Sequence, residues 1–270
     1  MISFPNAKIN LGLQITDKRA DGFHNLETVF FPIGWSDTLE FAISDELCFS
    51  TSGIAISGSP ESNLVMKAYN LLLKDFALPA LKIHLHKQIP FGAGLGGGSA
   101  DGAFMLRMLD HTFNLDISQE KLLEYAAVLG SDCPFFILNK PVFATGTGNI
   151  MKEINLNVKG LYLLLVKPPV EVSTARAFQN VVPQKPLISL SELINLPVQD
   201  WKNNIVNQFE SSVFPRYPEI AGIKTRLYDL GAVYASMSGS GSCVFGLFNE
   251  LPASIGTLFP WPYLTFSQKI

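Results

Sequence analysis

The sequence has 270 residues, of which 47% are hydrophobic and 16% are charged, and its net charge is −3. A chain of this length forms one or two domains and can fold without disulfides or structural metals. The slight acidic excess argues against a nucleic-acid partner, and the apolar runs are far shorter than the ~20 residues that span a membrane. With three scattered cysteines and no signal-peptide pattern, we expect a cytoplasmic protein with no membrane partner.

The chain opens with patterns that predict β-strands. Apolar residues alternate with polar or small ones at positions Ile9, Leu11, Leu13 and Ile15, which is the period of a half-buried strand. In such a strand Lys8 and Asn10 project from the face opposite the apolar set. Asp21-Gly22 marks a turn, and further strands are expected at residues 27–33 and 38–43.

The middle of the chain predicts helices on either side of a strand. A helix from residue 64 to 72 would be capped by Ser62 or Asn63, and residues 81–86 alternate as a strand. Helices are expected up to residue 113 and over residues 119–129, with Gly130 as a C-cap. His84 and His86 share one face of the strand, and with no third ligand nearby we expect a solvated face rather than a metal site.

The last part of the chain predicts a second domain. The polar segment 152–160 places a boundary there, which gives domains at residues 1–155 and 156–270. A strand is expected at residues 161–166, and a second apolar run covers residues 243–248. Helices are expected between them, near residues 174–180, 191–196, 203–214 and 220–230.

A cluster of glycines lies between the strand that ends near residue 86 and the helix that follows. Five glycines fall between Gly92 and Gly98, where a flexible backbone can bring N–H groups against an anion at a helix start. No lysine follows as a P-loop requires, and no acidic residue ends a following strand as a dinucleotide fold requires. A turn of purely structural use is the remaining alternative.

These glycines belong to a segment that resembles the phosphate loop of the GHMP small-molecule kinases. The segment consists of Pro90, Phe91, Gly92, Ala93, Gly94, Leu95, Gly96, Gly97, Gly98, Ser99 and Ala100. Residues 5–11 resemble the family's N-terminal motif, and residues 238–242 resemble its third motif. Residues 19–26 and 130–136 are similar to segments of one member, which phosphorylates a small-molecule substrate, a cytidine diphosphate-linked methylerythritol.

The resemblance implies a fold, co-substrates and a reaction. The fold is α+β, a two-domain GHMP-kinase-like arrangement with the active site in the interdomain cleft. The reaction is transfer of the ATP γ-phosphoryl to a tertiary hydroxyl, with Mg²⁺ held largely by phosphate oxygens and by no protein cage. We expect a monomer or a weak homodimer.

The resemblance also assigns catalytic roles. Asp132 would accept the hydroxyl proton, and Lys8 would keep Asp132 ionised and steady the transferred phosphoryl. Without the resemblance, Asp132 is as well explained by a turn after a helix end, and Lys8 by an exposed strand position. Asn10 would contact substrate or phosphate.

Further binding roles follow from the same resemblance. His24 would hydrogen-bond a cytosine that stacks on Phe23, with Phe178 as the opposite ring or else as the apolar face of a helix. Gly239, Ser240 and Gly241 would close over the substrate, or form a simple turn. Ser99 would bond phosphate or magnesium and could also cap the helix. Asn63 is a helix cap or an adenine contact.

Other functions stay open at this point. Gln208, next to Asn207, and residues 145–148 depart from the pattern of the relatives, which leaves finer substrate contacts undecided. Another GHMP kinase acting on mevalonate, homoserine or a sugar is the first alternative. A catalytically silent nucleotide-binding module and a dinucleotide oxidoreductase are the others.

Overall fold

The computed structural model describes residues 1–179 and 181–270, and the chain forms two compact units. Unit 1 consists of Met1–Lys8, Pro32–Phe91 and Gly96–Lys140, and unit 2 of Ile9–Phe31, Gly92–Leu95 and Pro141–Ile270. The glycine loop therefore belongs to unit 1 at both ends and to unit 2 in the middle. The predicted domain boundary at residue 155 stays a prediction.

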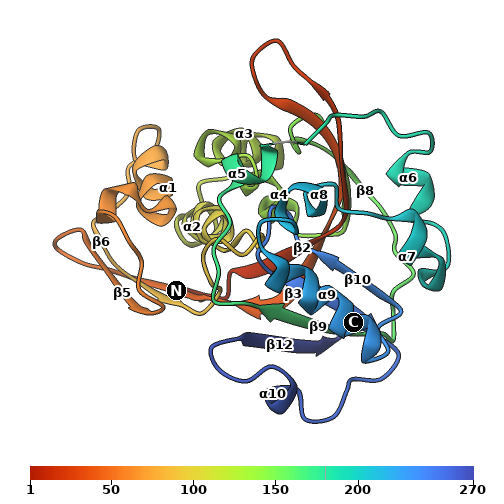
Figure 1. Cartoon of the computed structure of the whole chain (residues 1–270). Helices are drawn as coiled ribbons and strands as arrows, with labels where there is room; N and C mark the ends of the chain where they lie inside the picture. The colour runs from red at the N-terminus through yellow and green to blue at the C-terminus, as the bar shows by residue number, and fades with distance from the viewer. Residues whose placement is uncertain (180) are drawn as a thin grey trace. The chain divides into compact units, whose positions relative to one another are not determined.

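Unit 1 contains a four-stranded sheet in the order β1-β4-β6-β5 (Figure 1). The strands are β1 (Ile2–Ser3), β4 (Thr38–Ile43), β5 (Cys48–Gly53) and β6 (Leu81–Lys87), and only β5 runs parallel to its neighbour β6. Leu81, Ile83 and Leu85 alternate in β6 and are fully buried, which confirms the predicted period of two.

The helices of unit 1 follow in chain order as η1 (Pro60–Ser62), α1 (Leu64–Leu72), α2 (Gly97–Phe113), α3 (Gln119–Leu129) and α4 (Cys133–Leu138). Helix α1 packs on α2, and α4 packs on both α2 and α3. Phe41 of β4 stacks on Phe113 at the end of α2, with ring centroids 6.2 Å apart. The predicted helix at 119–129 is confirmed, whereas α4 was not predicted because six residues are too few to show a helical period.

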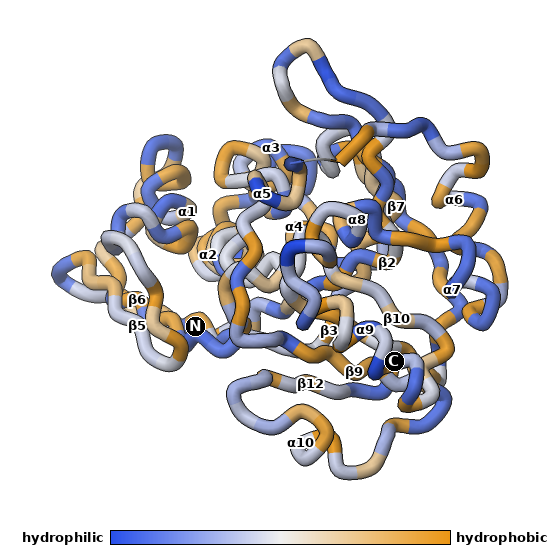
Figure 2. The backbone as a smooth tube through the Cα atoms, in the orientation of Figure 1, coloured by the Kyte–Doolittle hydropathy of each residue, from blue (hydrophilic) through white to orange (hydrophobic). Residues whose placement is uncertain are grey.

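Unit 2 contains parts of two long strands, β2 (Asn6–Lys18) and β3 (His24–Ser36). They form a four-stranded sheet with β7 (Val142–Thr145) and β8 (Ile150–Glu153), in the order β2-β3-β7-β8. A second, antiparallel sheet has the order β10-β11-β9-β12. Its strands are β9 (Tyr162–Lys167), β10 (Tyr234–Met237), β11 (Val244–Phe248) and β12 (Leu264–Lys269). The run of hydrophobic residues in β9 is orange in Figure 2, and it is buried from Leu163 to Val166.

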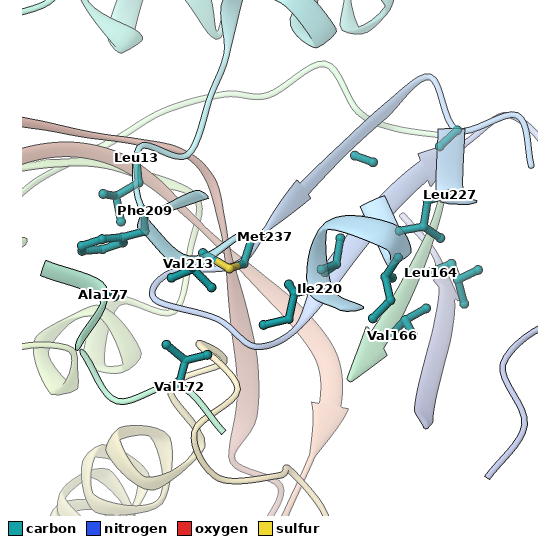
Figure 3. Packing of buried hydrophobic residues seen from close by; sticks show 14 of the residues in the cluster. Leu13, Leu164, Val166, Val172, Ala177, Phe209, Val213, Ile220, Leu227 and Met237 are labelled. Carbon is teal, nitrogen blue, oxygen red and sulfur yellow. The ribbon is translucent and has the colours of Figure 1, made fainter. Parts of the chain in front are cut away.

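The helices of unit 2 are mostly short. They are α5 (Thr174–Phe178), α6 (Leu190–Leu193), η2 (Val198–Asp200), α7 (Trp201–Asn204), α8 (Glu210–Val213), α9 (Pro218–Asp229) and α10 (Ile255–Leu258). Helix α9 buries Ile220, Ile223 and Leu227, which share one face at helical spacing. Figure 3 shows this face packed against Leu164 and Val166 of β9 in the core of unit 2.

Three helix predictions in unit 2 differ from the structure. The helix expected at 191–196 is α6, which already ends at Leu193. The helix expected at 203–214 is two short helices, because Leu13 of β2 bridges to Asn207 between them and the chain there is extended rather than helical. The helix expected at 174–180 ends at Phe178, and Asn180 lies outside the described residues. Within the described part of the chain, no helix has the length and apolar character needed to cross a membrane.

Candidate active site

Lys8 lies inside the protein, not on a solvated strand face. Ala7 to Leu13 of β2 are all buried, so both faces of the strand are covered, and the prediction of a half-buried strand was wrong there. Lys8 is only 4% exposed and Asn10 only 1%. Burial lowers the pKa of Lys8, and the nearby Asp132 carboxylate acts in the opposite direction.

Asp132 faces Lys8 within unit 1. Lys8 Nζ lies 3.7 Å from Asp132 Oδ2, and the Asp132 side chain is 36% exposed. Asp132 occupies the N-cap position of α4, yet its side chain makes no capping hydrogen bond. Asp132 does lie in a turn before α4, which the Cys133 N–H closes by donating to the Gly130 carbonyl at 3.2 Å. The pair combines a buried cation with a carboxylate that solutes can reach.

The glycine loop passes beside this pair. Gly96 has φ +70°, and a Cβ there would lie 2.9 Å from the Phe136 ring and 3.3 Å from Lys8 Cε. Only glycine fits both the left-handed backbone and this contact. The loop backbone at the start of α2 thus lies against the side chain of Lys8.

Helix α2 begins at Gly97, with Gly96 as its N-cap, so Ser99 is not the capping residue. The helix begins earlier than the serine suggests because the left-handed Gly96, three residues before Ser99, ends the loop. Burial raises the pKa of the Cys133 thiol to about 11, and the nearby Ser99 side chain acts in the opposite direction. Ser99 therefore lies next to the residue that follows Asp132.

The middle of the glycine loop is bound by the third motif, within unit 2. The Ser238 hydroxyl donates to the Gly94 carbonyl at 2.8 Å, and the backbone N–H groups of Ser242 and Cys243 donate to Gly92 and Ala93 at 3.0 and 3.2 Å. A Cβ on Gly94 would lie 1.9 Å from the Ser238 carbonyl oxygen, so the approach requires glycine. The glycine loop and the third motif are therefore joined by several hydrogen bonds.

Asn10 contacts the third motif, to which Gly239 and Ser240 belong. The Asn10 backbone N–H donates to Ser238 Oγ at 3.3 Å, and its side-chain amide donates to Thr28 Oγ1 at 2.9 Å. A Cβ on Gly239 would lie 3.2 Å from Asn10 Oδ1. Ser240 Oγ is 3.3 Å from Thr174 Oγ1. Substrate contacts by Asn10, Gly239, Ser240 and Gly241 stay predictions.

His24 and Phe178 are in direct contact. Their rings stack with centroids 4.8 Å apart and an interplanar angle of 16°. Phe209 meets the Phe178 ring edge-on at 4.8 Å, whereas Phe23 is 65% exposed. A base that stacks on the His24-covered face of Phe178 must first displace His24, which the sequence did not suggest.

Asn63 caps helix α1, which was one of the two roles predicted for it. Its Oδ1 accepts a hydrogen bond of 2.9 Å from the backbone N–H of Val65 at the start of α1. Among the described residues, no group of three or more His, Cys, Asp or Glu side chains could hold a metal ion. His84 and His86 instead hydrogen-bond Ser50 and Ser52 on the neighbouring strand.

Asn207 is a positioning residue whose role the sequence did not reveal. It is 2% exposed, and its side-chain amide donates to the carbonyls of Met237 at 2.7 Å and Gly239 at 2.8 Å. Its Oδ1 accepts from the Phe209 N–H at 3.0 Å. Gln208, which departs from the relatives, instead joins Ile15 of β2 to Val182. Asn207 therefore holds the third motif, which in turn holds the glycine loop.

Replacing Asn207 by alanine should lower the free energy of unfolding by about 1–3 kcal/mol, because two buried carbonyls and one N–H lose their partner. Urea denaturation measures the change. Asn204→Ala is the matched control, since the Asn204 amide donates one exposed hydrogen bond to Asp200 and should matter far less. Equal losses in the two variants would show that Asn207 does not hold the third motif.

Comparisons with known proteins show the family of this chain. The family profile described as GHMP kinases N terminal domain matches residues 63–140, and that of GHMP kinases C terminal matches residues 189–255. The chain belongs to the GHMP kinase family. This confirms the resemblance seen in the sequence and the two-domain fold class of mixed helices and sheets.

Two of the similar proteins carry the same name. A 4-diphosphocytidyl-2-C-methyl-D-erythritol kinase of Bacteroides fragilis is 59% identical over 253 residues, with 92% of each chain covered. The enzyme of the same name from Porphyromonas gingivalis is 46% identical, covering 97% of this chain and 98% of its own. A crystal structure of 4-(cytidine 5'-diphospho)-2C-methyl-D-erythritol kinase covers both chains completely with a TM-score of 0.84 and 28% identity.

Proposed function

We propose that this chain transfers the γ-phosphoryl group of ATP to the 2-hydroxyl of 4-diphosphocytidyl-2-C-methyl-D-erythritol, a step of the non-mevalonate route to isoprenoid precursors. The observation that carries the proposal is the pair of Lys8 and Asp132 beside Gly96 of the glycine loop. The relatives of 46–59% identity support the choice of alcohol.

Asp132 is the general base in this proposal. Its carboxylate is partly exposed, lies 3.7 Å from the Lys8 ammonium, and can accept the proton of a bound hydroxyl. The same ammonium stabilises negative charge on the transferred phosphoryl. Because phosphoryl transfer depends mainly on positioning and charge stabilisation, this pair and a nucleotide site are the essential parts.

The glycine loop is the proposed ATP site. Its apolar members Ala93, Leu95 and Ala100 are buried and anchor it. A Cβ on Gly98 would meet nothing within 4 Å, which leaves room for a ligand beside the first turn of α2. The N-terminus of this 17-residue helix favours a phosphate.

Adenine and magnesium complete the nucleotide site. An adenine contact by Asn63 would use its amide nitrogen, because Oδ1 already caps α1. Mg²⁺ would enter with ATP on phosphate oxygens and neutralise part of their charge, which suits a chain whose described residues offer no cluster of three metal-ligating side chains.

His24 and Phe178 are the proposed recognition site for the cytosine, with Phe23 as the exposed stacking ring. Replacing His24 by alanine should lower kcat/KM for the cytidine-linked alcohol about tenfold to a hundredfold, mainly through KM, because one base contact is worth about 1–3 kcal/mol. Steady-state kinetics with cytidine- and uridine-linked substrates measure this. His111→Ala, which replaces an exposed histidine of α2, is the control. Equal use of both bases by the unmodified protein would contradict the His24 role.

The test of the proposed function compares alcohols directly. The purified protein is incubated with ATP, Mg²⁺ and, in turn, the cytidyl-linked methylerythritol, mevalonate, homoserine and galactose. We expect the highest kcat/KM with the cytidyl-linked alcohol. A higher value for any of the other three would replace this function by that of another GHMP kinase.

Two broader properties are also proposed. A cytoplasmic location is supported by Cys48, Cys133 and Cys243, which are all free thiols. A monomer or weak homodimer is the expected state, and light scattering of the purified protein measures it.

A further inference from the structure

A buried lysine joins the two ends of the glycine loop. Lys87 is the last residue of β6, just before the loop, and is 1% exposed. Its ammonium donates to Oδ2 of Asp101 in α2 at 2.7 Å. It also donates to Oδ2 of Asp37, the residue that follows β3. Asp37 is 0% and Asp101 2% exposed, so all three titratable side chains are buried within unit 1.

Asp37 also holds the backbone that enters the loop. Its Oδ1 accepts hydrogen bonds from the N–H groups of Gln88 at 2.6 Å and Ile89 at 2.8 Å. These two residues directly precede Pro90, the first residue of the loop. Both oxygens of Asp37 are therefore used, one on the lysine and the other on the entering strand.

Lys87 also contacts the loop and the helix that leaves it. Its Nζ lies 5.3 Å from the centroid of the Phe91 ring. A Cβ on Gly97 would be 2.9 Å from Lys87 Nζ and 2.8 Å from the Ile89 side chain, so the first helical residue is pressed against the end of β6. Asp101 is one turn further along the same helix.

The arrangement is an expensive way to stabilise a fold. Buried charges lose their hydration, and an apolar cluster of similar volume often serves stability as well or better. Asp101 Oδ1 is buried with no hydrogen-bond partner among the described residues, which is rare in native proteins. Burial accordingly raises the pKa of Asp101 to about 8, against the opposing effect of Lys87. Fixed geometry is the benefit that such a network can supply.

We propose that Asp37, Lys87 and Asp101 form a positioning network that fixes both ends of the glycine loop and thereby sets the affinity for ATP. This inference rests on the proposed function, since it takes the loop as the ATP site. The network tethers β6 to α2, so the loop between them has less conformational freedom to lose when ATP binds. None of the three residues needs to touch the substrate.

The experiment measures ATP binding without the alcohol, by isothermal titration calorimetry with ATP and Mg²⁺. Asp101→Asn is the single variant, and Asp37→Asn/Lys87→Met/Asp101→Asn is a triple variant that leaves no buried charge unpaired and should fold. We expect the Kd for ATP to rise about tenfold in each, the scale of one charge-assisted hydrogen bond. The control Lys82→Met removes an exposed lysine of β6 and should bind ATP normally.

Turnover kinetics separate positioning from a merely structural role. In both network variants we expect a raised KM for ATP, with kcat and the KM for the alcohol near those of the unmodified protein. An unchanged Kd for ATP in the folded triple variant would overturn the proposal. So would equal losses in kcat and both KM values. If the unmodified protein binds ATP but phosphorylates a different alcohol, the proposed function fails while the binding comparison still decides the role of the network.

Discussion

Replacing Asp132 by asparagine should lower kcat about 10²–10⁴-fold, the usual contribution of a general base, while the Kd for ATP changes little. Asparagine has nearly the same shape, so the start of α4 should keep its structure, but its amide cannot take a proton from the alcohol. Lys8 would lose the carboxylate that lies 3.7 Å from its ammonium. Single-turnover kinetics at saturating ATP measure the chemical step.

Asp45→Asn is the matched control for this variant, because Asp45 is an exposed aspartate of unit 1. Its kcat should equal that of the unmodified protein. A nearly normal kcat for Asp132→Asn would remove Asp132 from the role of base. A loss of ATP affinity that matches the loss of rate would place Asp132 in nucleotide binding instead.

Replacing Lys8 by methionine should lower kcat about 10²–10³-fold, the scale of losing one group that stabilises transition-state charge. Methionine fills much of the space of the buried lysine stem beside Gly96, so the fold should persist. Lys18→Met, at the exposed end of the same strand, is the control. Loss of kcat without a change in melting temperature is the expected result.

The pH dependence of kcat tests Lys8 a second way. Burial lowers the pKa of Lys8, so its ammonium loses the proton at a lower pH than an exposed lysine does. The rate should therefore fall as pH rises through this lowered pKa. In Lys8→Arg the fall should disappear, because a guanidinium stays charged at these pH values. The same alkaline fall in both proteins would mean that another group causes it.

The sequence was most informative where local pattern decides structure. Strand Thr38–Ile43 and helix Gln119–Leu129 follow from apolar spacing and turn residues alone. The family resemblance rests on the glycine loop, and the structure brings Lys8 and Asp132, 124 positions apart in sequence, to this loop. Neither residue shows this role by its neighbours, so the motif match was essential.

Tertiary contacts decided what the sequence left open. Period two in β2 indicated one solvated face, but elements distant in sequence cover both faces and bury Lys8 and Asn10. Asn207 likewise shows no local signal, because its partners Met237 and Gly239 are 30 residues or more away. The network around Lys87 joins three separate segments, so no single stretch of sequence contains it.

The small net charge of −3 is compatible with a polyphosphate ligand in this account. In the proposed ATP site, backbone N–H groups at the start of α2 and the dipole of this helix would supply much of the attraction. Lys8 adds a fixed cation next to Gly96, and the Lys87 ammonium is already held by Asp37 and Asp101. A surface rich in lysine and arginine is therefore not required.

Phosphorus NMR of the reaction product tests the central claim most directly. The protein is mixed with 4-diphosphocytidyl-2-C-methyl-D-erythritol, ATP and Mg²⁺, and the spectrum is followed as ADP forms. Phosphate on the 2-hydroxyl should give one new phosphomonoester resonance without splitting by a proton on the same carbon, because that carbon carries none. A resonance split by carbinol protons, or no new phosphomonoester while unmodified ATP remains, would contradict the proposed reaction.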